Sequence, residues 1–195
     1  MSLSYVVTIL LKAAGSVFVI SPFVLQSTLT FALENSVMKA ASTQQIKEEL
    51  KSLSQKELTE LCLRLTRYKK ENKELLSYIL FDAHDRQGYI DTIKQELDEE
   101  FAALPRNNRY FAKKGLRSML KSIAKYSRYM SGKEAEAELR LHFCRDMKNN
   151  GMASHTHQAT MQIYTSQINK VQSLIPLLHE DLQFGFQKQL NELAG

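Results

Sequence analysis

The chain has 195 residues, of which 44% are hydrophobic and 24% are charged, a balance that excludes a wholly disordered protein. Its net charge of +5 at pH 7 is well below the excess that dedicated nucleic-acid-binding domains carry. Seven glycines and three prolines are too few for the tight turns of an all-β fold, so the composition predicts an all-α protein, an irregular bundle of about six helices built from αα-hairpins.

Residues 1–37 form an apolar segment in which Lys12 and Glu34 are the only charged residues. Its uncharged stretch of 21 residues is long enough to span a bilayer of roughly 30 Å, although serines, threonines and a proline weaken the hydrophobic signal. Charged, periodic sequence begins at Met38. We therefore expect a helical domain over residues 38–195, and the segment before it has three interpretations: an extension upstream of the true start, a membrane anchor, or a buried helix.

Two capping signals predict where the first helices begin. Ser42 or Thr43 is expected to cap a helix that ends near Ser52. Ser54 and Glu57 have the spacing of a capping box and open a second helix. The apolar residues of this second helix recur at i, i+3, i+4 and i+7 and are predicted to face the core: Leu58, Leu61, Cys62 and Leu65.

A polar run at residues 69–72 is predicted to turn the chain, and the apolar pattern after it predicts a short helix over about 75–83. Two short helices joined by a tight link form an αα-hairpin. Cys62 and Cys144 both lie in apolar helical patterns and are predicted to be reduced residues of the core. With no disulfide framework or zinc spacing, we expect a cytoplasmic protein.

The remaining apolar patterns predict longer helices over about 85–103, 109–130 and 133–149. A last pattern begins near Ser154 and follows a heptad spacing over residues 161–182. Pro176 is expected to kink this helix. We interpret the heptad seam as internal to the bundle, with a homodimer contact as the alternative.

Three stretches carry a resemblance to known proteins: L-S-Q-K-E-L-T-E-L-C-L-R-L-T-R-Y-K-K-E-N-K-E-L-L from Leu53, L-H-F-C-R-D-M-K-N-N-G from Leu141 and L-H-E-D-L-Q-F from Leu178. Over about residues 43–190 the chain resembles a family of small all-α bacterial proteins of uncharacterised function. The resemblance implies a helical fold and carries over no active site.

Motifs for catalysis and cofactor binding are missing from the sequence. It has no phosphate-binding glycine loop, no nucleophile elbow and no zinc-protease motif, and no glutamate precedes a histidine by three residues, as in bundle di-iron sites. His155 and His157 are interpreted as part of a solvated helix cap. We therefore expect no catalytic, cofactor-binding or metal-ligating residues and a protein that is not an enzyme.

Charge is distributed unevenly in the middle of the chain. Between Pro105 and Met130 there are eight basic residues and no acidic one, here called the basic ridge: Arg106, Arg109, Lys113, Lys114, Arg117, Lys121, Lys125 and Arg128. Four of them recur every four residues along one helix face. The preceding helix has six acidic and two basic residues between Asp85 and Glu100, a net charge of −4.

This pattern has two interpretations: the basic and acidic helices pair inside the fold, or the ridge binds a partner. From the second interpretation we expect a non-enzymatic protein-interaction module that binds another protein. The alternatives are a nucleic-acid-binding protein that uses helix 106–128 and a membrane-tethered cytoplasmic domain anchored by residues 1–37.

Overall fold

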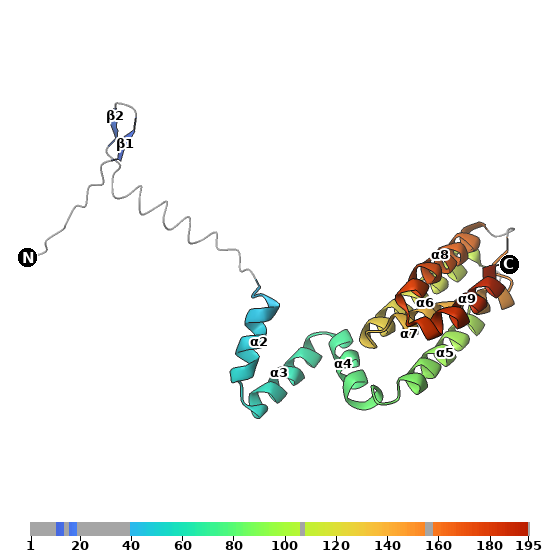
Figure 1. The fold of residues 1–195 in the computed structure, drawn as a ribbon, viewed down its shortest axis with the longest axis horizontal. Coiled ribbons are helices and arrows are strands. Elements are labelled where there is room, and N and C mark those ends of the chain that lie inside the picture. Colours follow the sequence, from blue (N-terminus) through green and yellow to red (C-terminus); the bar gives the residue numbers. More distant parts are fainter. Residues whose placement is uncertain (1–10, 14–15, 19–39, 106–107, 155–157, 195) are drawn as a thin grey trace, which may run out of the picture. The chain divides into compact units, whose positions relative to one another are not determined.

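The computed structural model describes residues 11–13, 16–18, 40–105, 108–154 and 158–194, and these are overwhelmingly helical (Figure 1), which confirms the all-α prediction. The α-helices are α2 (Thr43–Ser52), α3 (Gln55–Tyr68), α4 (Lys70–Ser77), α5 (Arg86–Ala102), α6 (Arg109–Tyr129), α7 (Lys133–Asn149), α8 (Gln158–Leu174) and α9 (Glu180–Ala194). A π-helical turn, η1 (Tyr78–Asp82), continues α4, and a 3-10 turn, η2 (Ile175–Leu177), follows α8. The chain divides into two units, residues 1–60 and 61–195.

Most of the apolar segment 1–37, and the boundary expected after it, lies outside the described residues. Within it, two short strands, β1 (Leu11–Ala13) and β2 (Ser16–Phe18), pair antiparallel. No helix in the described ranges is both long enough and apolar enough to cross a membrane.

The predicted cap at Ser42 and the predicted capping box at Ser54 are confirmed, and Ser42 also forms a capping box with Gln45. The Ser42 backbone N–H donates to Gln45 Oε1 at 2.9 Å, and the Ser54 backbone N–H donates to Glu57 Oε2 at 2.8 Å. The return bonds, from the third helical backbone N–H to the serine hydroxyl, are also present. These bonds satisfy backbone donors that the first helical turn leaves free.

The predicted core role of the α3 stripe is wrong. No residue of α2, α3 or α4 is buried, and the Leu65 side chain is 49% exposed. The turn predicted over residues 69–72 is confined to Lys69, which is extended, and α4 starts at the next residue. An amphipathic pattern identifies an apolar face but does not say which element covers it. Helices α3 and α4 therefore bury no residue between them.

The hydrophobic core is built from α5 to α9, with α7 at its centre (Figure 1). Helix α7 packs against α5, α6, α8 and α9, so it is buried on more than one face. The apolar residues at four-residue steps, Ala135, Leu139, Phe143 and Met147, are buried, and so are three further apolar residues, Ala137, Leu141 and Cys144. Because the central helix needs apolar residues nearly all round, a single stripe underestimates its burial.

The predicted kink at Pro176 is instead a break between two helices. Proline lacks the backbone N–H that would continue the helix, and the backbone at Leu178 is extended before α9 begins. The heptad residues Tyr164, Val171 and Ile175 are buried in the core of the same chain, which supports the internal interpretation of the seam.

The two cysteines differ in their exposure. Cys144 is buried in α7, as predicted, and burial raises the pKa of its thiol to about 12. Cys62 is exposed, so the prediction that it belongs to the core is wrong; it lies on the uncovered stripe of α3.

An aromatic disulfide reagent is therefore expected to titrate one thiol per native chain near pH 8, since the reactive species is the thiolate. In denaturant both thiols should react, and in the native Cys62→Ser variant neither should. Absorbance of the released thiolate follows the reaction. Rapid reaction of both native thiols would mean that α7 is not enclosed as described.

Candidate functional site

Helix α6 carries the basic ridge opposite its core face. The helix begins after Asn108, whose side-chain oxygen accepts hydrogen bonds from the backbone N–H groups of Tyr110 and Phe111 at 3.1 and 3.2 Å. Its buried residues recur by three and four: Ala112, Leu116, Met119, Ile123 and Ser127. This periodicity fixes the rotation of the helix, and the basic side chains between these positions point outward.

The structure places seven of the eight ridge residues, because Arg106 lies outside the described residues. Lys113 and Lys125 are part-buried, and the other five are exposed: Arg109, Lys114, Arg117, Lys121 and Arg128.

Lys125 differs from its neighbours because it belongs to the junction between α4 and α6. Its Nζ lies 2.8 Å from Glu74 Oε2 and 4.5 Å from the centre of the Tyr126 ring. The Tyr129 hydroxyl donates to the same Glu74 oxygen at 3.2 Å. The hydrogen bond from Lys125 holds the pKa of the Glu74 carboxyl below its ordinary value. Lys125 is therefore a structural member of the ridge.

The acidic helix α5 pairs with α7 and not with α6. Lys94 Nζ lies 2.7 Å from Glu138 Oε1, and Arg86 Nη1 lies 3.6 Å from Glu134 Oε2. The Tyr126 hydroxyl, which donates to Glu96 at 3.5 Å, makes the one polar contact between α5 and α6 seen among the described residues.

The interpretation that the acidic helix neutralises the basic ridge is thus wrong. Packing of apolar faces sets which helices are neighbours, and it places α5 beside a helix with acidic residues of its own. Within the described part of the chain, six ridge residues form no ion pair: Arg109, Lys113, Lys114, Arg117, Lys121 and Arg128.

Two depressions adjoin along the ridge and share Ser118 and Lys121 in their walls. The smaller has a volume of about 420 Å³ and includes Tyr110, Lys113 and Arg117. The larger, of about 860 Å³, lies between α4, α6 and the start of α7. Its charged residues are Glu71, Lys121, Lys125, Arg128, Lys133 and Glu136. The ridge therefore borders a mostly basic hollow with two carboxylates in its wall.

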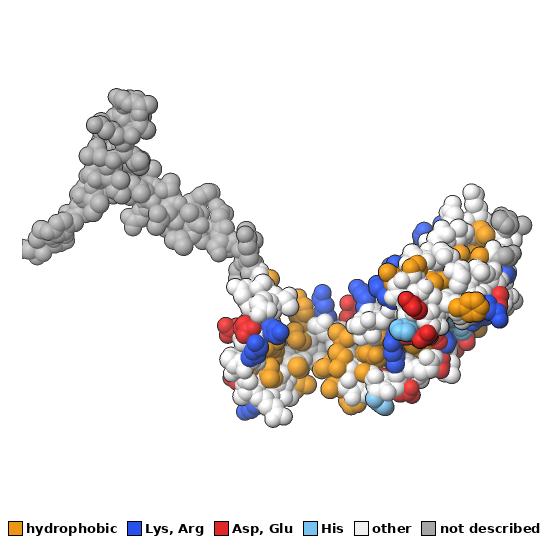
Figure 2. All heavy atoms as spheres, viewed as in Figure 1, with side chains coloured by type: hydrophobic (Ala, Val, Ile, Leu, Met, Phe, Trp, Pro, Cys, Tyr) orange, Lys and Arg blue, Asp and Glu red, His pale blue; other side chains and the backbone are white. Residues whose placement is uncertain are grey.

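A second exposed surface, which was not predicted, lies in the segment where the sequence predicted a short helix over about residues 75–83. Three consecutive residues of η1, Ile79, Leu80 and Phe81, are 54%, 62% and 67% exposed. Beside them, Leu65, Leu75, Leu76 and Ile79 line an apolar notch of about 250 Å³ between α3 and α4. Figure 2 shows hydrophobic side chains exposed over this part of the chain.

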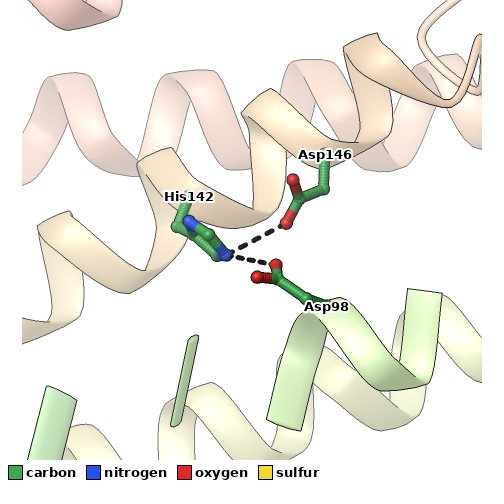
Figure 3. A group of neighbouring side chains, drawn as sticks. All are labelled: Asp98, His142 and Asp146. Atoms are coloured by element: carbon green, nitrogen blue, oxygen red, sulfur yellow. Dashed lines mark hydrogen bonds and ion pairs between the residues drawn. The ribbon is translucent and has the colours of Figure 1, made fainter. Parts of the chain in front are cut away.

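A third group, also missed from the sequence, joins α5 to α7 (Figure 3). His142 Nε2 lies 2.6 Å from Asp98 Oδ1 and 3.1 Å from Asp146 Oδ2. The three donor atoms lie within 4.8 Å of one another. One signal was available in the sequence: His142 and Asp146 are four residues apart and therefore share a helix face.

The positions of these side chains follow from the core packing. On α5, Asp98 follows the buried Leu97, and on α7, His142 and Asp146 each precede a buried residue. A side chain one position from a buried residue lies at the flank of its helix, beside the interface. The packing of α5 against α7 brings the two flanks together.

In comparisons with family models, curated proteins and solved structures, nothing matches this chain.

Proposed function

We propose that this protein is a non-enzymatic interaction module that binds an acidic segment of another protein on the basic ridge of α6. The observation that carries the proposal is the set of six ridge cations that find no acidic partner among the described residues. Like charges at four-residue steps destabilise an isolated helix, so a ridge that the fold does not neutralise suits an external anion.

The acidic residues beside the ridge favour discrete carboxylates over a continuous phosphate backbone. Glu71 and Glu136 line the larger depression, and Glu74 neutralises Lys125. A nucleic acid carries a negative charge on every phosphate and would place some of them beside these carboxylates, whereas a peptide can present carboxylates opposite the cations alone. The exposed apolar residues of η1 support the same class of partner, because such patches typically mark contacts with proteins or membranes.

One observation favours nucleic acid as the second candidate. Tyr110 is 72% exposed and lines the smaller depression beside Lys113 and Arg117. Exposed aromatic rings next to cations are typical of surfaces that stack single-stranded bases.

A reducing compartment is supported by the exposed free thiol of Cys62, since secreted proteins usually pair their cysteines. We infer that the module acts in the cytoplasm.

Binding of labelled probes to the full chain tests the proposal. The first probe is a helical peptide of about 20 residues with glutamates along one face, and the second is a single-stranded RNA of similar length. Fluorescence anisotropy in roughly 150 mM salt measures each affinity. Replacing Lys113, Lys114, Arg117 and Lys121 by Gln is expected to weaken peptide binding roughly 30-fold, at about 0.5 kcal/mol for each exposed pair.

The matched control replaces four basic residues outside the ridge, Arg64, Arg67, Lys170 and Lys188, by Gln. This control variant lowers the net charge by the same amount as the ridge variant. Its affinity for the peptide should stay within about twofold of that of the unaltered chain, unless attraction depends on net charge alone. RNA binding tighter than peptide binding, with a slope of log K against log salt near −3 for four contacts that the ridge variant abolishes, would replace the proposal by the nucleic-acid alternative. Equal losses in the two variants would reject a specific site.

A further inference from the structure

We propose that Asp98, His142 and Asp146 form a binding site for one divalent first-row transition-metal ion, and that zinc suits these donors. The inference goes beyond the proposed function, because none of the three residues belongs to the basic ridge. In the described part of the chain, this is the one group of three or more His, Cys, Asp or Glu side chains close enough to share an ion.

The geometry of the three donor atoms suits a shared ion. Zinc binds imidazole nitrogen and carboxylate oxygen at about 2.0–2.2 Å, so neighbouring ligand atoms of a tetrahedral site lie about 3.3–3.6 Å apart. The contact from His142 Nε2 to Asp146 Oδ2, 3.1 Å, is slightly shorter than this spacing. The contact to Asp98 Oδ1, 2.6 Å, must widen by roughly 0.7 Å, and the Asp98 side chain is 54% exposed, which leaves room for that shift.

A second, independent observation is an oxygen left without a hydrogen bond. Asp146 Oδ2 is buried and receives none. His142 Nε2 can carry one proton, and the shorter contact directs that proton to Asp98. Asp146 Oδ2 therefore lies beside a second carboxylate and 3.1 Å from an imidazole nitrogen whose proton is directed elsewhere. A buried acceptor of this kind is costly, and a cation between the three side chains would satisfy it.

The electrostatics of the group also favour a cation. Two carboxylates converge on one imidazole, which carries at most one positive charge. A divalent ion would balance both carboxylates.

The donor types select the class of ion. Magnesium and calcium prefer ligand sets made of oxygen alone, whereas imidazole together with carboxylate suits zinc and its neighbours. Three protein ligands leave a fourth position that water can fill. Because the Asp98 side chain is exposed, water can reach this position. With ligands from both helices, the bound ion would cross-link α5 to α7.

The test uses the untagged full chain, stripped with a chelator and then titrated with zinc against a chromophoric competitor. We expect one zinc ion per chain, and a rise in melting temperature on zinc addition, because a ligand that binds only the folded state stabilises it. Even the loss of an outer-shell partner weakens metal sites about 10–100-fold. His142→Gln and Asp98→Asn, which each remove a ligand, should therefore weaken binding by at least about 100-fold and abolish the thermal shift.

Two controls separate this site from other histidines. His179→Gln removes an exposed histidine whose Nδ1 lies 3.2 Å from Asp181 Oδ2, and the double variant His155→Gln/His157→Gln removes the H-x-H pair. Both should bind zinc as the unaltered chain does. Asp98→Asn changes an exposed residue, so it keeps the test valid if His142→Gln fails to fold. The absence of one-to-one binding, its persistence in Asp98→Asn, or its loss in the His155/His157 variant would overturn the proposal.

Discussion

Phe143→Ala is expected to lower the free energy of unfolding by about 3–5 kcal/mol, the usual cost of truncating a buried phenylalanine. Phe143 lies on the central helix α7 and is fully buried, with its ring centre 5.3 Å from that of Phe101 on α5. The change removes apolar burial and leaves a cavity between two helices that are held on several sides, so the surroundings cannot collapse to fill it. Denaturant titration followed by circular dichroism measures the loss.

Leu61→Ala is the matched change in α3. Leu61 belongs to α3, which has no buried residue, so truncation should cost less than about 1 kcal/mol. The apolar pattern of the sequence assigned Leu61 to the core. Because the structure does not bury it, we expect only a small loss of stability. Losses of similar size at Leu61 and Phe143 would mean that the α3 stripe is covered in the folded protein.

Glu136→Ala is expected to cost about 3 kcal/mol, because it leaves a buried guanidinium without its counter-charge. Arg140 is 8% exposed, and its Nε and Nη2 atoms donate to Glu136 Oε1 at 3.0 and 2.9 Å. Its remaining hydrogen bond is to the amide oxygen of Gln167, a neutral group. The loss lies at the lower end of the range for buried pairs because the Glu136 side chain is 16% exposed.

Glu99→Ala makes the same chemical change at an exposed position of α5 that has no ion pair with any described residue. Its effect should stay within about 0.5 kcal/mol, so the difference between the two variants isolates the burial of Arg140. Denaturant midpoints at one pH provide the comparison. A Glu136→Ala variant as stable as Glu99→Ala would show that water reaches the guanidinium.

Local signals in the sequence predict the helices of the core well. The bounds predicted for α7, residues 133–149, are those observed, since Gly132 precedes the helix and Gly151, with φ of 68°, follows it. Helices α5 and α6 were predicted to within one residue at each end. Capping residues and apolar periodicity act within a few residues of the helix ends, and for this reason they can be read from the chain directly.

Features that depend on which helices are neighbours could not be predicted in this way. To predict the ion pairs of α5, one would have to know that α7 and not α6 lies beside its charged flank. To predict the group at His142, one would have to know that Asp98, 44 residues away in sequence, lies beside it. The stripe of α3 was periodic and was nevertheless left uncovered. Each of these depends on tertiary packing, which overrides local pattern.

The central claim is that the cations of the basic ridge serve a partner rather than the fold, and the free energy of unfolding tests it most directly. In the variant with Lys113, Lys114, Arg117 and Lys121 replaced by Gln, helix propensity is conserved and like-charge repulsion is relieved. We expect its stability, measured by denaturant titration at low salt, to equal that of the unaltered chain or to exceed it by less than about 1 kcal/mol. A loss of more than about 1 kcal/mol would show that the ridge is neutralised inside the protein and would contradict the claim.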